Sequence, residues 1–277
     1  MLLPASLSAQ WINYTPPGVP HTKDGKVNLT APTPRAPDGK PDLTGVWEHE
    51  LSTQADYKKL FGADYDPAKQ TTLIGMENEH VHKYGMNALV DFKQGEVALT
   101  PAGDAAQKKR RAEYNPLNVC HGEYGWPVLG LLSEPLKIVQ APKETVILYE
   151  IDGMHRQVFT DGRKFPAEFE LPAYLGYSVG RWEKDTFIVE TRGFNDRTPI
   201  DAMGHPRSEG MHVTETYRRR DYGHLDTELT FDDPAYYTKP FTIKISYNLV
   251  ADGDIFEMFC GQNEKDRAHM VVDAPKK

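Results

Sequence analysis

The sequence predicts a mostly β protein built as a single antiparallel barrel, with an extended N-terminal arm and a small helical segment. From residue 136 onward, short runs rich in β-branched and aromatic residues follow one another at nearly regular spacing, which favours a barrel or sandwich over βαβ units. Turn-forming pairs such as Asp152-Gly153 and Asp252-Gly253 separate most of these runs. Two runs alternate cleanly between apolar and polar residues, as a barrel wall does when one side is packed and the other is wet.

The composition is that of a folded globular protein, since 39% of the 277 residues are hydrophobic and 26% are charged. A chain of this length buries one sizeable core or two small ones. The 32 basic residues against 40 acidic ones give a net charge of −8, which repels phosphate backbones and argues against a nucleic-acid partner. No run reaches the ~18 apolar residues that cross a bilayer, so we expect no membrane span.

The N-terminal residues predict a periplasmic or secreted protein. Residues 1–9, MLLPASLSA, are apolar and small, and they resemble the end of a secretory signal peptide with cleavage after Ala9. The alternative is an ordinary apolar terminus. In an exported protein Cys120 and Cys260 could form a disulfide worth roughly 4–5 kcal/mol, and the alternative is a pair of buried free thiols.

The first part of the chain is predicted to be an arm followed by the start of the barrel domain. Residues 10–42 are proline-rich and lack apolar periodicity, which favours an extended arm lying over the body. The barrel domain then covers residues 43–277 and begins with a strand at Leu43–His49. A helical insertion occupies about residues 50–115.

Within that insertion, three helices are expected. Two short ones are predicted at Ala55–Phe61 and Asp66–Met76. A longer polar helix begins at Thr100-Pro101, where Thr serves as N-cap and Pro occupies the first helical position. It runs to about Tyr114, before Asn115-Pro116 ends it.

The rest of the domain is predicted to consist of strands. The expected runs are Leu136–Gln140, Thr145–Ile151, His155–Thr160, Tyr177–Glu183, Thr186–Arg192, Met211–Arg219, His224–Phe231, Phe241–Leu249 and Asp254–Cys260. Asp161-Gly162 is interpreted as a hairpin turn after the third of them.

Several segments resemble a large group of exported bacterial proteins without an established activity. These are PDLTGVW (41–47), LTPAG (99–103), FTDGR (159–163), GYSVGRWEKDTFIVET (176–191), GFND (193–196), SEGMHVTETYRR (208–219), DDPAYYTKPF (232–241) and CGQNEKD (260–266). Gly45-x-Trp47 in the first strand is also similar to the opening motif of lipocalins. That resemblance implies a calycin-like barrel in which Trp47 closes the floor.

Glu215 is the strongest candidate for chemistry. In a regular strand from Met211, the residues Val213, Glu215 and Tyr217 share one apolar face. A carboxyl in such surroundings either shows a raised pKa, as a general acid or base does, or finds a cationic partner. The alternatives are a structural pair with an inward Arg or Lys, and a strand face that puts Glu215 in water.

His212 is a second candidate acid or base, because imidazole titrates close to neutrality. It faces away from Glu215 unless a bulge near Gly210 turns both inward. Glu209 precedes the strand and could orient the imidazole of His212. The alternative is an exposed or cross-strand histidine.

A metal site is a further possibility, although no motif completes a ligand set. His205, Glu209 and His212 have a two-histidine, one-carboxylate spacing, but Pro206 and Gly210 disfavour the helix that would align them. His80-x-His82 is a second possible ligand pair. The alternative is a chance scatter of ten histidines, and we expect neither a metal nor another cofactor.

Other polar residues are candidates for ligand binding. Arg156 and Arg163 could clamp an anionic group, and the alternative is a pair of salt bridges, for example to Asp161. His155, beside Arg156, is a further catalytic candidate. Asn195 and Asp196 follow a strand end, where an Asx turn or a group at a barrel mouth is expected.

Aromatic residues could wall an apolar pocket, and Tyr177 and Tyr217 are the ones assigned to ligand contact. Gly176-Tyr177-Ser178-Val179-Gly180 matches GxSxG, but a hairpin pattern follows it where a nucleophile elbow requires a helix. Ser178 is therefore not expected to be a nucleophile.

Taken together, these features favour an exported enzyme that performs hydrolysis, elimination or isomerisation on a small apolar or aromatic compound bound inside the barrel. Glu215 or His212 would be the acid or base. The alternatives are a non-catalytic carrier or sensor of an apolar ligand, and a metal-dependent enzyme using His205, Glu209 and His212.

Overall fold

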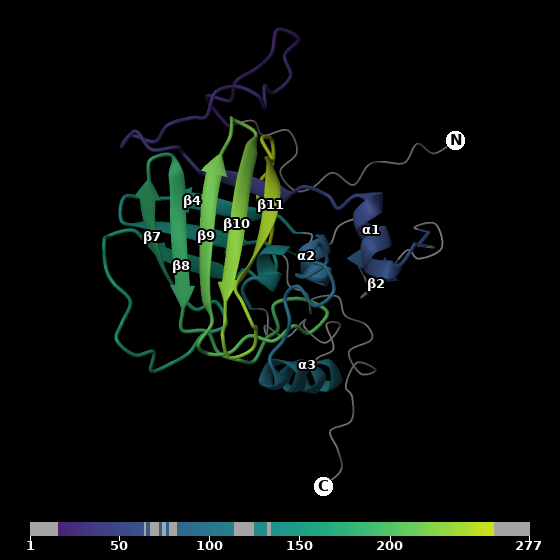
Figure 1. Cartoon of the computed structure of the whole chain (residues 1–277). Helices are drawn as coiled ribbons and strands as arrows, with labels where there is room; N and C mark the ends of the chain where they lie inside the picture. The colour runs from purple at the N-terminus through teal and green to yellow at the C-terminus, as the bar shows by residue number, and fades with distance from the viewer. Residues whose placement is uncertain are drawn as a thin grey trace.

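The described residues form a closed β-barrel, which confirms the predicted fold class (Figure 1). The computed structural model describes residues 16–63, 65–66, 72–73, 76–77, 82–113, 125–131 and 134–257. Nine strands within these ranges make the barrel. They are β1 (Gly45–His49), β4 (Leu136–Gln140), β5 (Glu144–Tyr149), β6 (His155–Phe159), β7 (Tyr177–Glu183), β8 (Thr186–Arg192), β9 (His212–Arg219), β10 (His224–Asp232) and β11 (Phe241–Leu249).

The order of strands around the barrel is β1-β11-β10-β9-β8-β7-β6-β5-β4, and β1 closes the ring by pairing with both β11 and β4. Among these strands, every neighbouring pair is antiparallel except β6 and β7, which are parallel. The predicted hairpin at Asp161-Gly162 is therefore wrong. Residues 160–176 instead cross over and bring the chain back to begin β7 beside β6, as a parallel pair requires.

Most strand bounds agree with the prediction, but no strand forms over residues 254–257. Here backbone groups bind side chains instead of a neighbouring strand. The amide of Ile255 donates to the carboxylate of Asp254, and the amide of Phe256 donates to the carboxylate of Glu150. The rest of the predicted strand, residues 258–260, lies outside the described residues, as do both cysteines.

The helical insertion contains α1 (Gln54–Phe61), α2 (Lys83–Met86) and α3 (Pro101–Glu113), and a 3-10 turn, η2 (Val128–Leu131), follows it. Thr53 caps α1 through a capping box with Asp56. The helix predicted at Asp66–Met76 is wrong where it can be compared, because β2 (Thr72–Leu73) pairs with β3 (Met76–Glu77). None of the described helices is long and apolar enough to cross a bilayer.

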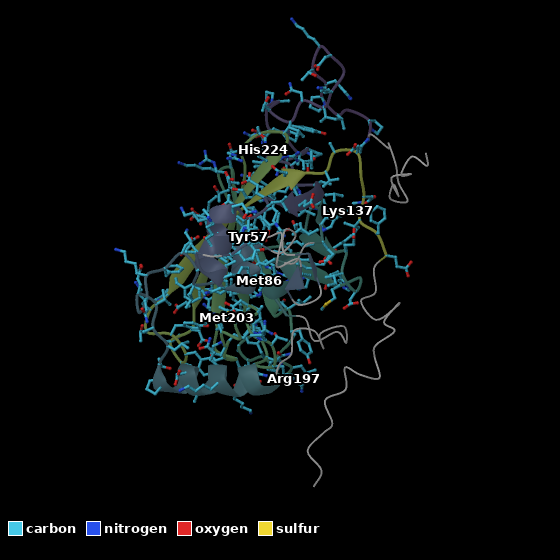
Figure 2. All side chains as sticks on the ribbon, turned by 90° about the vertical axis from the view of Figure 1, so that its right-hand side faces the viewer. Tyr57, Met86, Lys137, Arg197, Met203 and His224 are labelled. Carbon is cyan, nitrogen blue, oxygen red and sulfur yellow. The ribbon has the colours of Figure 1, made fainter. Side chains whose placement is uncertain are left out.

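Helix α3 lies at one end of the barrel, and the described part of the arm lies at the other (Figure 1). Side chains of α3 donate to the carbonyl oxygens of Met203 and Arg197, which Figure 2 places toward the end that carries this helix. At the opposite end, the amides of Tyr222 and Gly223 donate to Ala31 and Leu29 in the arm. The described part of the arm therefore contacts this end of the barrel.

Trp47 is buried near the barrel end that carries the arm. Its side chain is fully buried, and its indole N–H donates to the carbonyl oxygen of Leu43 at 3.0 Å. The guanidinium of Arg219 lies 4.9 Å from the indole ring and donates to the carbonyl oxygen of Asp42. Burial lowers the pKa of Arg219 to about 10.

Candidate functional site

An ion pair between Arg156 and Glu215 lies inside the barrel. The alternation of β9 turns Glu215 inward beside Val213 and Tyr217, and that of β6 turns Arg156 inward. The two side chains are 1% and 0% exposed, and both terminal nitrogens of Arg156 donate to the carboxylate. Tyr217 donates to the same carboxylate at 2.6 Å. Glu215 thus has the cationic partner that the sequence offered as one of its two outcomes.

Arg156 also binds two hydroxyl groups from β7 and β8. Its Nε donates to Ser178 Oγ at 3.0 Å and its Nη2 to Thr191 Oγ1 at 3.2 Å, and these hydroxyls lie 2.9 Å apart. The indole ring of Trp126 packs against the guanidinium at 4.5 Å. Burial has the largest single effect and lowers the pKa of Arg156, but Glu215, Tyr149 and Tyr217 together raise it by more, so the net shift is upward. Arg156 therefore stays protonated.

Three tyrosines surround this pair: Tyr149, Tyr217 and Tyr247. Burial raises the pKa of Tyr149 to about 12 and also raises the pKa values of Tyr217 and Tyr247, with Glu215 adding to each shift. All three phenols are therefore protonated near neutral pH. The indole N–H of Trp126 is buried without a hydrogen-bond partner among the described residues.

A pocket of about 270 Å³ opens where β6 and β7 separate. The two strands share only two register pairs, Val158↔Ser178 and Phe159↔Val179, so the wall parts on one side of this short contact. The pocket is lined by His155, Arg156, Gln157, Phe159, Leu175, Gly176, Tyr177 and Ser178. Because Arg156 and Ser178 are buried, the pocket adjoins the internal polar network.

Aromatic rings border the pocket. The rings of Phe159 and Tyr177 lie 5.2 Å apart, and Phe165 and Phe169 of the crossover each lie 6.3 Å from Tyr177. Arg163 covers the ring of Phe159 at 3.8 Å. The lining thus combines the aromatic rings of Phe159 and Tyr177 with the exposed polar side chains of His155 and Gln157 and with the buried residues Arg156 and Ser178.

The structure separates the other predicted acid–base residues from Glu215. His212 points to the outer face of β9, where its Nε2 lies 3.6 Å from Glu190, because the register with β10 continues to His212 without a bulge. Burial and then Arg192 lower the pKa of His212. Glu209 is exposed in the preceding loop, and His155 is exposed on β6 at the pocket.

Three of the predicted binding residues, Arg163, Asn195 and Asp196, do not line the pocket. Arg163 binds the carboxylate of Asp161 and donates to the hydroxyl of Tyr177, which is the salt bridge expected as its alternative. Asn195 forms the expected Asx turn by accepting from the amide of Arg197, and it also accepts from Arg207. Asp196 is exposed beside Arg110, and neither it nor Asn195 lines the pocket.

The candidate metal ligands do not converge. His205 is held by the buried carboxylate of Asp201 through Nδ1 at 2.5 Å, away from Glu209 and His212. His82 packs against His49, their ring centroids 5.1 Å apart, while His80 lies outside the described residues. Across the described ranges, no group of three or more His, Cys, Asp or Glu side chains is placed to hold a metal ion.

Ser178 lies within β7, which continues into the hairpin with β8, so the GxSxG segment is not a nucleophile elbow. Sequence reasoning missed its role in binding Arg156. It also missed Thr191 and Tyr149. The signal for Thr191 was present, because it shares the apolar face of β8 with Phe187 and Val189.

Comparisons with protein-family models, with curated proteins and with solved structures found no match for this chain.

Proposed function

We propose that this protein binds a small apolar or aromatic molecule in the pocket between β6 and β7, as a carrier or sensor. The observation that carries the proposal is the pocket itself, which combines an aromatic rim with a buried polar floor. Ligand sites commonly have this composition, in which apolar walls supply affinity and a few fixed polar groups supply orientation. Its volume of about 270 Å³ suits a compound of one or two rings.

The test is a ligand-observed NMR screen of small aromatic compounds against a variant that fills the pocket. Leu175 lines the pocket and is partly exposed, so Leu175→Trp should fold and occupy the space. Leu171→Trp is the matched control, since Leu171 belongs to the same crossover, is 90% exposed and does not line the pocket. Compounds should bind the wild type and Leu171→Trp but not Leu175→Trp. Binding that survives in Leu175→Trp, or no binding at all, contradicts the proposal.

Acid–base catalysis on the bound compound is the second candidate, favoured by the carboxyl, phenol and guanidinium that touch one another beside the pocket. We place it second because both oxygens of Glu215 are engaged by Arg156 and Tyr217. Compounds identified by the screen should be incubated with the wild type and with Glu215→Gln. Product formed by the wild type and lost in the variant supports catalysis, and unchanged compound supports a carrier.

We further propose that the protein acts in the periplasm or outside the cell. The support is the resemblance of its sequence segments to exported bacterial proteins. Cell fractionation of the native host, with the antibody signal followed in the periplasmic and cytoplasmic fractions, tests this. A signal confined to the cytoplasm contradicts it.

A further inference from the structure

Two of the three arginines around the pocket are each paired with a carboxylate. Arg156 is the one Lys, Arg, Asp or Glu residue among the pocket's lining residues, and Glu215 neutralises it from inside the barrel. Arg163 at the rim is bound to Asp161. Arg192, on the neighbouring strand, is exposed to solvent, which screens its charge. A molecule in the pocket therefore meets no net charge close beneath it.

Binding of a charged ligand in this pocket costs free energy, because the ligand loses its hydration. Transfer of an ion from water into an apolar pocket costs free energy that only an opposite, uncompensated charge repays. Arg156 lines the pocket and Glu215 does not, so the positive member of the buried pair lies nearer to the pocket than the negative one. This dipole favours a hydrogen-bond acceptor such as a carbonyl or hydroxyl oxygen, but it does not repay the desolvation of a carboxylate.

We propose that the pocket selects uncharged aromatic compounds that carry one polar oxygen, and that Glu215 sets this preference by neutralising Arg156. This inference rests on the proposed function, because it concerns the ligand class of the same pocket. It gives Glu215 a role in specificity that requires no contact with the ligand.

Three probes of nearly the same shape test the preference. Benzamide is neutral, benzoate is an anion and benzamidine is a cation, so their affinities differ mainly through charge. Binding to the wild type should be measured by NMR titration at neutral pH. Benzamide should bind at least roughly tenfold more tightly than either ion.

Variants of the Arg156–Glu215 pair should then change the relative affinities for benzamide and benzoate. Glu215→Gln leaves Arg156 uncompensated, so benzoate should gain affinity relative to benzamide by roughly tenfold or more. Glu190→Gln is the matched control, since it makes the same charge change at a partly exposed position on the outer face of β8. The double variant Arg156→Gln, Glu215→Gln removes both charges and should retain the preference of the wild type for benzamide. If Glu215→Gln does not fold, the wild type and the double variant still decide the matter.

The outcomes separate the two proposals. If an ion binds the wild type as tightly as benzamide does, and Leu175→Trp abolishes that binding, the pocket is real and the charge inference is overturned. An unchanged ratio of benzoate affinity to benzamide affinity in a folded Glu215→Gln overturns it too. If none of the three probes binds the wild type, the proposed function itself fails.

Discussion

At the scale of single residues, the Arg156–Glu215 pair shows how a barrel interior accommodates charge. Each ion alone would cost several kcal/mol to bury, so the pair persists because every principal donor and acceptor has a partner. Ser178, Thr191 and Tyr217 supply those partners from three neighbouring strands. The network therefore links β6 to β7, β8 and β9 through side chains.

His82 makes the stability of the fold depend on pH. It caps α2 by accepting from the amide of Tyr84 with Nδ1, which requires that nitrogen to be unprotonated. Burial, followed by the nearby His49 and Lys83, lowers the pKa of His82 from 6.5 to about 3. Below pH 6.5 the unfolded chain binds this proton and the folded chain does not, so stability falls as the pH decreases toward 3.

His82→Asn keeps a capping side chain and removes the titration. At about pH 4.5 the wild type should lose roughly 2–3 kcal/mol relative to neutral pH through this residue, and the variant should lose less by that amount. Urea unfolding at a series of pH values measures the difference. His21→Asn, at an exposed position of the arm, is the control and should follow the wild type. Parallel curves for His82→Asn and the wild type would show that His82 is not the group responsible.

At the scale of elements, the junction of β6 and β7 depends on Gly176. Its φ of +67° is a conformation that L side chains rarely adopt, and a Cβ there would lie 2.8 Å from the carbonyl oxygen of Arg192 and 2.9 Å from Phe194. Gly162 in the same crossover also has a positive φ, +83°, but has open space around it. A substitution at Gly162 therefore adds backbone strain alone, whereas a substitution at Gly176 adds the same strain and a steric overlap.

Gly176→Ala should therefore destabilise the protein more than Gly162→Ala, by roughly 1–3 kcal/mol, because it adds overlap to the same strain. Equilibrium urea unfolding of both variants provides the comparison. Gly176→Ala should also weaken ligand binding, since Gly176 lines the pocket. Equal losses of stability in the two variants would mean that the junction tolerates the added methyl group.

The sequence predicted what local patterns determine. Alternation placed the strands and turned Glu215 inward, and the Thr100-Pro101 pair marked the start of α3. The hairpin predicted from Asp161-Gly162 was wrong, because the pairing of β6 with β7 depends on contacts between residues separated by the crossover. The partner of Glu215 could not be chosen either, since Arg156 lies three strands away around the barrel and reaches it across the interior.

At the scale of the whole molecule, the extent of pairing between neighbouring strands differs around the barrel. Strands β9 and β10 share eight register pairs, whereas β6 and β7 share two. Local opening requires less free energy where fewer backbone hydrogen bonds must break. The barrel should therefore open first beside the pocket.

Hydrogen exchange followed by mass spectrometry tests this expectation. Peptides covering β6 and the start of β7 should exchange faster than peptides covering β10, and a bound aromatic compound should slow exchange at β6 and β7 selectively. The arm and α3 serve as internal references at the two ends of the barrel (Figure 1). Uniform protection around the ring would contradict a preferred opening at this junction.

The parallel pair also follows from simple parity. Strands that run alternately up and down can close a ring only when their number is even, and the described ring has nine. One seam between like-directed neighbours is thus unavoidable, and it falls between β6 and β7. A tenth strand inserted there could restore full alternation, but it would occupy the gap in which the pocket lies.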